Sequence, residues 1–223
     1  MNFASMKGDK PFEGYSEETF DFLWGIRMNN NRDWFQAHKQ QYVDSLYEPT
    51  KALAREVFAR FDQPNLLCKV SRIYRDARLH PPDPYKESLW ICIRQDVEWW
   101  AENPTLYFEI RPEGAAYGFV FWKPKVEVME RFRQENAADP SVFSALLKEA
   151  EENVGVPFTA QSYKRPKECE NPNVGPWYNW RMDIECTVHL DPGPELFDRN
   201  LPDRVADHLL ALLPVNNYFS RLV

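Results

Sequence analysis

The sequence predicts an α+β fold, in which a helical N-terminal segment packs on a largely antiparallel sheet and further helices follow in the C-terminal half. Three observations lead to this prediction. Apolar residues recur at helical spacing over 16–61, and the pattern then changes to alternation over 66–123. The links between the alternating runs are short, which favours an antiparallel meander. Helical spacing returns after residue 124, so a second group of helices should follow the strands.

The N-terminal segment should form three helices. Ser16 can cap the first, which should end near Met28, where a run of asparagines provides a turn. The second is expected over 32–47 and the third over 50–61. We expect two separate helices here because Pro49 lies between them, and proline interrupts a helix.

Strands are expected next, since β-branched and aromatic residues alternate with polar ones between turn-rich joints. The expected strands are one that opens at Lys69, then 89–94, 105–111 and 117–123. The rest of the chain should contain helices over 124–136 and 139–154, strands over 158–163 and 181–190, and a helix from Pro202 that ends at Pro214. Between the last two strands, a long loop rich in Pro and Asn is unusual unless it is functional or disordered.

We predict one α+β domain over 14–223, after a loose lead at 1–13. Its helical part is 14–62, and its sheet and remaining helices are 66–223. The 223 residues carry a formal net charge of −7, with an isoelectric point near 5.2, which argues against a nucleic-acid partner. With no apolar leader and no apolar run long enough for a membrane span, we predict a cytoplasmic protein without a membrane segment.

The sequence lacks the common signatures of metal and cofactor sites. The four cysteines show no C-x-x-C pairing and no histidine at zinc-finger spacing, so we interpret them as reduced structural thiols and expect no metal site. We interpret His38, on an aromatic helix face, as a hydrogen-bonded structural residue. No glycine-rich phosphate-binding motif and no G-x-S-x-G occurs, so any cofactor stays unknown.

The stretch 69–86 holds the candidate site. It carries five basic residues against two acidic ones, Asp76 and Asp83, within a chain that is acidic overall. The basic residues are Lys69, Arg72, Arg75, Arg78 and Lys86. Prolines at 81, 82 and 84 stiffen the loop that carries them. Guanidinium groups on a rigid loop suit a carboxylate or phosphate, because parallel charge-assisted hydrogen bonds fit such an anion. The competing interpretation is structural: Asp76 and Glu87 would pair with the arginines internally.

Three short motifs resemble those of a known family. The first joins Asn30 and Asn31 to Trp34 and Phe35; the second joins Arg72, Arg75, Asp76 and Arg78 to Pro84, Tyr85 and Lys86; the third is Lys164, Arg165 and Pro166. Together they resemble the domain-of-unknown-function family 2461, uncharacterised proteins of bacteria and fungi, over about 12–215. The resemblance implies one α+β unit in which the three motifs meet, and it brings no established activity. Leu79 stands where the family favours phenylalanine, and the loop 80–83 is one residue shorter than the family's.

The leading hypothesis is a basic pocket for an anionic small molecule that carries phosphate or carboxylate. Its expected residues are Arg72, Arg75, Asp76, Arg78 and Lys86, with Tyr85 and Trp34 as walls and Lys164 and Arg165 closing it from the long loop. Whether it is an enzyme is left open: His80, Asp76 and Tyr85 are the candidates for acid–base chemistry. The alternative is a non-enzymatic protein–protein interaction module that uses the 164–180 loop, with Trp177, Tyr178 and Trp180 on a flat exposed patch.

Overall fold

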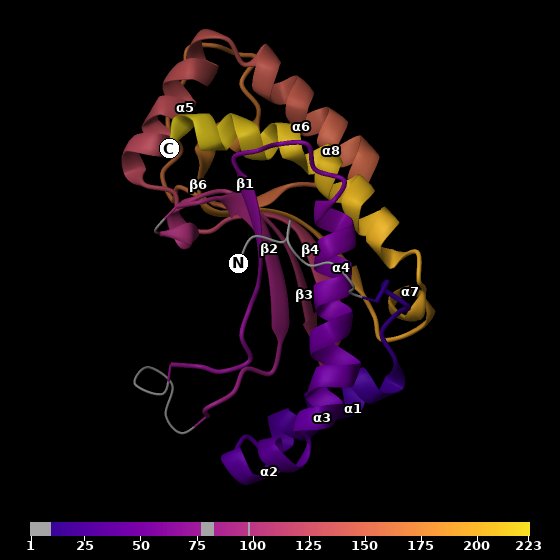
Figure 1. Cartoon of the computed structure of the whole chain (residues 1–223). Helices are drawn as coiled ribbons and strands as arrows, with labels where there is room; N and C mark the ends of the chain where they lie inside the picture. The colour runs from indigo at the N-terminus through magenta and orange to yellow at the C-terminus, as the bar shows by residue number, and fades with distance from the viewer. Residues whose placement is uncertain (1–9, 77–82, 98) are drawn as a thin grey trace. The chain divides into compact units, whose positions relative to one another are not determined.

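The computed structural model describes residues 10–76, 83–97 and 99–223 (Figure 1). The helices are α1 (Glu17–Met28), α2 (Arg32–Ala37), α3 (Lys39–Gln41), the π-helix η2 (Tyr42–Tyr47), α4 (Glu48–Phe58), the 3-10 helix η3 (Trp100–Glu102), α5 (Val126–Ala138), α6 (Ser141–Val154), the 3-10 helix η4 (Pro176–Asn179), α7 (Pro194–Phe197) and α8 (Leu201–Leu222). The strands are β1 (Leu66–Val70), β2 (Leu89–Gln95), β3 (Thr105–Arg111), β4 (Gly114–Phe121), β5 (Thr159–Ser162) and β6 (Trp180–Leu190).

Within the described residues, the strands form one antiparallel sheet of six, in the order β1-β2-β3-β4-β6-β5. The predicted α+β class is therefore confirmed, with helices in both halves of the sequence. Among the described residues, no helix is long and apolar enough to cross a membrane.

The chain divides into two compact units. The N-terminal unit comprises residues 1–93, 108–117 and 189–206, and the C-terminal unit comprises 94–107, 118–188 and 207–223. The division falls within β2, β3, β4 and β6, so each of these strands contributes residues to both units. The single domain expected over 14–223 stays a prediction.

In the N-terminal unit, the helical segment does not stop at Pro49 as predicted. The wider turns of η2 run directly into α4, and the backbone N–H of Glu48 donates to the carbonyl of Val43, five residues earlier. Pro49 thus lies in the first turn of α4, a position where proline is tolerated. Figure 1 shows α1, α2 and α3 gathered at one end of α4.

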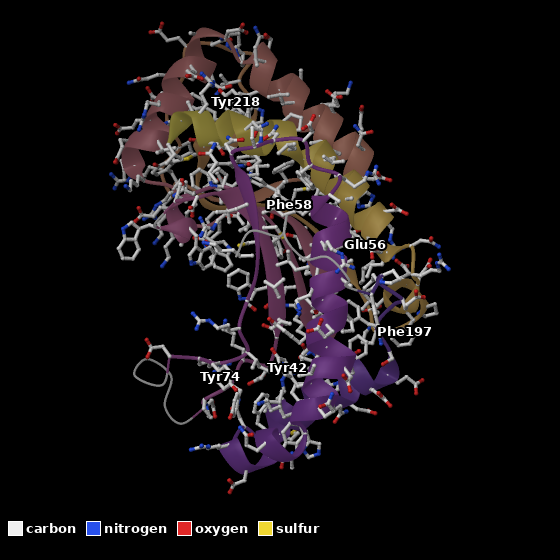
Figure 2. The ribbon with its side chains drawn as sticks, viewed as in Figure 1. Tyr42, Glu56, Phe58, Tyr74, Phe197 and Tyr218 are labelled. Carbon is white, nitrogen blue, oxygen red and sulfur yellow. The ribbon has the colours of Figure 1, made fainter. Side chains whose placement is uncertain are left out.

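In the C-terminal unit, the core is an aromatic cluster built by α5, α6 and the end of α8. Phe132 meets Phe143 edge-to-face with ring centroids 4.8 Å apart, and Phe219 lies 5.5 Å from Phe143. Tyr218, labelled in Figure 2, accepts a hydrogen bond from the buried amide of Asn136 at 3.0 Å. The predicted end of the last helix at Pro214 is therefore wrong, because burial of the apolar residues beyond it holds the chain helical to Leu222.

Candidate functional site

The predicted strand at Lys69 begins and ends earlier than expected, and a paired loop follows it. β1 ends at Val70, and residues 71–76 then pair with 83–90. The N–H of Arg75 donates to the carbonyl of Pro84 at 2.9 Å, and the N–H of Lys86 donates to the carbonyl of Ile73 at 2.7 Å. These bonds flank an antiparallel bridge between Tyr74 and Tyr85. Arg75 and Lys86 are therefore held in adjacent arms of one hairpin-like loop, which we call the basic hairpin (residues 71–76 and 83–87).

Asn30, on the turn between α1 and α2, anchors this hairpin. Its side-chain oxygen accepts from the N–H of Tyr85, and its side-chain nitrogen donates to the carbonyl of the same residue, both at 3.0 Å. Tyr85 is 3% exposed as a residue, and its ring stacks on Phe35 with centroids 4.3 Å apart. Tyr42 and Tyr74, both labelled in Figure 2, also pack against Phe35. Tyr85 thus fixes the hairpin to the helices.

Trp34 lies in the same helical segment and is partly exposed. Its ring stacks on His38 at 4.0 Å and lies so close to Gly25 that a Cβ there would come within 2.4 Å of it. His38 Nδ1 lies 2.8 Å from the carbonyl oxygen of Trp34, which confirms the interpretation of His38 as a hydrogen-bonded residue on an aromatic face. The use of Trp34 and Tyr85 as walls of a ligand pocket stays a prediction.

Three cations of the basic hairpin influence one another. The pKa of Lys86 is lowered, first by its partial burial and then by the positive charges of Arg72 and Arg75, while Glu109 acts in the opposite direction. The Lys86 ammonium lies 5.4 Å from the centre of the Trp90 ring. Within the described part of the chain, no carboxylate lies within 4.0 Å of either Arg72 or Lys86. Arg72 and Lys86 thus carry positive charge without a close carboxylate in the described ranges, and an anion would offset it.

Glu87 partly supports the structural interpretation of this cluster. It accepts a 2.6 Å hydrogen bond from Nε of Arg27 and lies 3.9 Å from the guanidinium of Arg75. Arg27 also binds Glu113 through both of its terminal nitrogens. Glu87 therefore neutralises Arg27 first and Arg75 only loosely, which leaves the other two cations of the hairpin without a close carboxylate in the described ranges.

The remaining predicted site residues are placed as follows. Asp76 is exposed on the basic hairpin. Arg78 and His80 lie outside the described residues. Lys164 and Arg165 are exposed in the C-terminal unit, so their closing over the hairpin stays a prediction. No group of three or more His, Cys, Asp or Glu in the described ranges could hold a metal ion.

The aromatic residues of the long loop lie in the interior of the C-terminal unit. Trp177, Tyr178 and Trp180 are only 5%, 7% and 7% exposed. Trp177 meets Phe143 edge-to-face at 5.1 Å, and Trp180 stacks on Phe158 at 6.1 Å. These side chains therefore do not form the flat exposed patch that the interaction-module hypothesis expects.

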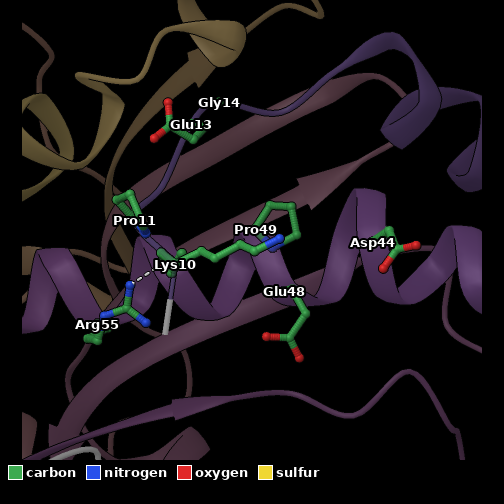
Figure 3. Close-up of a pocket in the computed structure, with 9 residues that line it drawn as sticks. Lys10, Pro11, Glu13, Gly14, Asp44, Glu48, Pro49 and Arg55 are labelled. Carbon is green, nitrogen blue, oxygen red and sulfur yellow. Dashed lines mark hydrogen bonds between the residues drawn. The ribbon is translucent and has the colours of Figure 1, made fainter. Parts of the chain in front are cut away.

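Two cavities add to the candidate sites. One, of about 520 Å³, lies between the segment 10–14 and the helices η2 and α4 (Figure 3). Arg55 donates to the carbonyl of Lys10 across it at 2.6 Å. Its charged residues are two cations and three carboxylates, so it does not favour an anion; they are Lys10, Arg55, Glu13, Asp44 and Glu48.

The second cavity, of about 350 Å³, lies in the C-terminal unit and is lined mainly by cations. This cavity was not predicted from the sequence, where Arg133 was not among the candidate site residues. A signal was present, since Val126, Met129, Glu130 and Arg133 follow the i, i+3, i+4, i+7 spacing of one helix face.

The comparison with protein families decides where this chain belongs. Residues 18–218 match the family described as "Conserved hypothetical protein (DUF2461)". The chain belongs to the DUF2461 family. The resemblance drawn from the three motifs is thereby confirmed over nearly the whole chain. In this DUF2461 protein, the first two motifs meet through Asn30 and Tyr85. Searches of curated proteins and of solved structures found no match.

Proposed function

We propose that this DUF2461 protein binds an anionic small molecule, carrying a phosphate or carboxylate group, at Arg72, Arg75 and Lys86 of the basic hairpin. The observation that supports the proposal is that Arg72 and Lys86 have no carboxylate within 4.0 Å among the described residues. The pKa of Lys86 agrees with this, since it is lowered first by burial and then by the charges of Arg72 and Arg75. A bound anion would offset these charges. It would also accept hydrogen bonds from two guanidinium groups, a geometry that suits the oxygens of phosphate and carboxylate.

The rigid support of the hairpin favours binding over a purely structural role. The Asn30 amide and the Phe35 ring hold Tyr85, and Lys86 follows it directly in the chain. A site that is already positioned loses little conformational entropy when its ligand arrives. A cytoplasmic location is part of the proposal, because the four cysteines are free thiols and reduced cysteines suit that compartment.

The test is a thermal-shift panel of inorganic phosphate, sulfate, nucleotides, sugar phosphates and dicarboxylates on the wild-type protein. A ligand at a hundred times its Kd stabilises by about 2.7 kcal/mol, which raises Tm by several degrees. We expect such a shift with at least one anion. The shift should be lost in Arg72→Gln and Lys86→Gln.

Arg199→Gln is the matched control. Arg199 is an exposed arginine of the same unit, and it lies outside the basic hairpin. The control should keep the full shift and its dependence on ligand concentration. If no anion shifts the wild type, or if Arg72→Gln and Lys86→Gln respond as strongly as the control, the proposal is wrong.

A further inference from the structure

The cavity of about 350 Å³ in the C-terminal unit has an unusual charge balance for this acidic protein. Four cations line it against a single carboxylate, that of Glu130. The cations are Lys123, Arg133, Lys167 and Arg181. Within the described ranges, none of the four has a carboxylate within 4.0 Å. The volume falls in the range typical of pockets for small organic ligands.

Arg133 provides the strongest indication of a ligand. Arg133 is only 8% exposed, and it lines the cavity from α5. Its Nη1 donates a long hydrogen bond of 3.5 Å to the hydroxyl of Tyr163. Burial of a guanidinium is costly unless hydrogen bonds and an opposite charge compensate for it. Since the described protein residues place no carboxylate close to Arg133, an anion in the cavity would supply that compensation.

Tyr163 forms an apolar surface beside these charges. The guanidinium of Arg133 lies 5.0 Å from the ring centre, and the ammonium of Lys167 lies 5.2 Å from it. The N–H of Tyr163 donates to the carbonyl of Asn179 at 2.9 Å, which fixes the backbone that carries the ring. Met129 and Met182 also line the cavity. A ligand here would therefore meet both positive charge and apolar surface.

A local irregularity of β6 brings two consecutive residues into this cavity. Neighbours in a regular strand point to opposite faces, yet Arg181 and Met182 both line it. The pairing of β6 with β5 shifts register on each side of Met182, which pairs with Gln161. Asp183, the next residue, has a left-handed backbone with φ of 50°. Such bulges redirect side chains and are frequent beside functional sites.

The start of α5 adds a polar contribution. The helix begins at Val126, which lines the cavity, and its N-cap residue Lys125 makes no side-chain hydrogen bond to the first turn. The amides at a helix N-terminus favour negative charge. These amides add to the positive charge of the buried Arg133, which lies on the same helix face.

We infer that this cavity is a second anion site, which takes a small organic anion whose phosphate or carboxylate group binds Arg133 and Arg181 and whose apolar body lies against Tyr163 and Met182. The inference is independent of the basic hairpin, because every residue that carries it belongs to the C-terminal unit. The apolar surface distinguishes this site from one suited to inorganic phosphate alone.

Methyl groups of methionine report on this cavity directly. Met129 and Met182 line it, whereas Met28 lies in α1 of the N-terminal unit. We would label the full chain with ¹³C at the methionine methyl groups and titrate it with phenyl phosphate, benzoate and inorganic phosphate. Met129→Leu and Met182→Leu assign the signals. Phenyl phosphate or benzoate should shift the Met129 and Met182 signals in a saturable manner and leave Met28 unchanged.

The two organic probes identify the anionic group, and inorganic phosphate measures the part played by the apolar body. Tighter binding of phenyl phosphate than of benzoate indicates a phosphate ligand, and the reverse order indicates a carboxylate. Inorganic phosphate should bind more weakly than phenyl phosphate. If neither organic probe shifts Met129 or Met182 at millimolar concentrations, or if inorganic phosphate binds as tightly as phenyl phosphate, the inference is wrong.

Variants then separate the pocket cations from general charge. Arg181→Gln and Lys167→Gln change exposed side chains and should each weaken binding about tenfold, the usual effect of losing one hydrogen bond to a charged group. Arg133→Gln should weaken it further, provided that its methyl spectrum stays that of a folded protein. Arg131→Gln is the control, because Arg131 is exposed on the same helix and does not line the cavity. Equal loss in Arg131→Gln and Arg181→Gln would overturn the inference.

Discussion

The side chain of Asn30 forms two hydrogen bonds with the backbone of Tyr85, one as acceptor and one as donor, both at 3.0 Å. An amide side chain can pair in this way with the N–H and C=O of one residue, much as a neighbouring strand would. The two residues are 55 positions apart, so this pair fastens the turn between α1 and α2 to the basic hairpin.

Replacement of Asn30 should loosen the hairpin and destabilise the protein. Asn30→Ala removes both hydrogen bonds and leaves the Tyr85 N–H and C=O in a partly buried position without these partners. We expect a loss of about 1–3 kcal/mol in the free energy of unfolding, measured by urea denaturation. Asn30→Asp keeps an acceptor for the N–H but has no donor for the carbonyl, so it should also be destabilised. If both variants unfold at the wild-type urea concentration, the pair does not hold the hairpin.

The elements were largely predictable where periodicity alone decides them. The alternation over 105–111 predicted β3 with the bounds that the structure has, Thr105–Arg111. In a strand, the environment of each residue follows directly from its position. The rule that proline ends a helix failed at Pro49 and Pro214. At Pro49 the π-helix η2 continues directly into the first turn of α4. At Pro214 the helix continues because the aromatic residues that follow are buried.

The candidate sites were predictable only in part. The charge excess at Arg72, Arg75 and Lys86 is visible in the sequence, but its attachment to Asn30 depends on a contact over 55 positions that no local pattern contains. Arg133 was missed for a different reason. A charged helix residue is normally solvated, and only the packing of α5 against its neighbours makes this one buried.

The ion pair of Arg27 and Glu113 should affect stability in acid. The hydrogen bond from Arg27 lowers the pKa of Glu113 below its ordinary value. At pH values between the pKa of Glu113 in the folded chain and its pKa in the unfolded chain, the unfolded chain binds more protons. The free energy of unfolding therefore falls as the pH falls through this range. Urea denaturation of wild type and Arg27→Gln at several pH values below 5 measures this slope. The variant should show the shallower dependence on pH, and an identical slope would contradict the role of the pair.

Lys86 should report directly on the charge of the basic hairpin. Burial and the charges of Arg72 and Arg75 lower its pKa, so Arg72→Gln should raise that pKa towards the ordinary lysine value. An anion bound at the hairpin should raise it too. NMR titration of the lysine side-chain signals in alkaline solution, assigned with Lys86→Gln, measures both changes. An unchanged Lys86 pKa in Arg72→Gln would mean that the two groups do not interact.

The left-handed backbone at Asp183 gives a prediction for the second site. Gln161 donates a 2.6 Å hydrogen bond to the Asp183 carboxylate, and both Asp183→Gly and Asp183→Ala remove it. The two variants differ in the cost of φ at 50°, which glycine adopts readily and alanine does not. Asp183→Ala should therefore be about 1 kcal/mol less stable than Asp183→Gly in urea denaturation. At an ordinary strand position, the alanine variant would be more stable than the glycine variant. If Asp183→Ala proves more stable than Asp183→Gly, the bulge beside Met182 does not require the left-handed conformation.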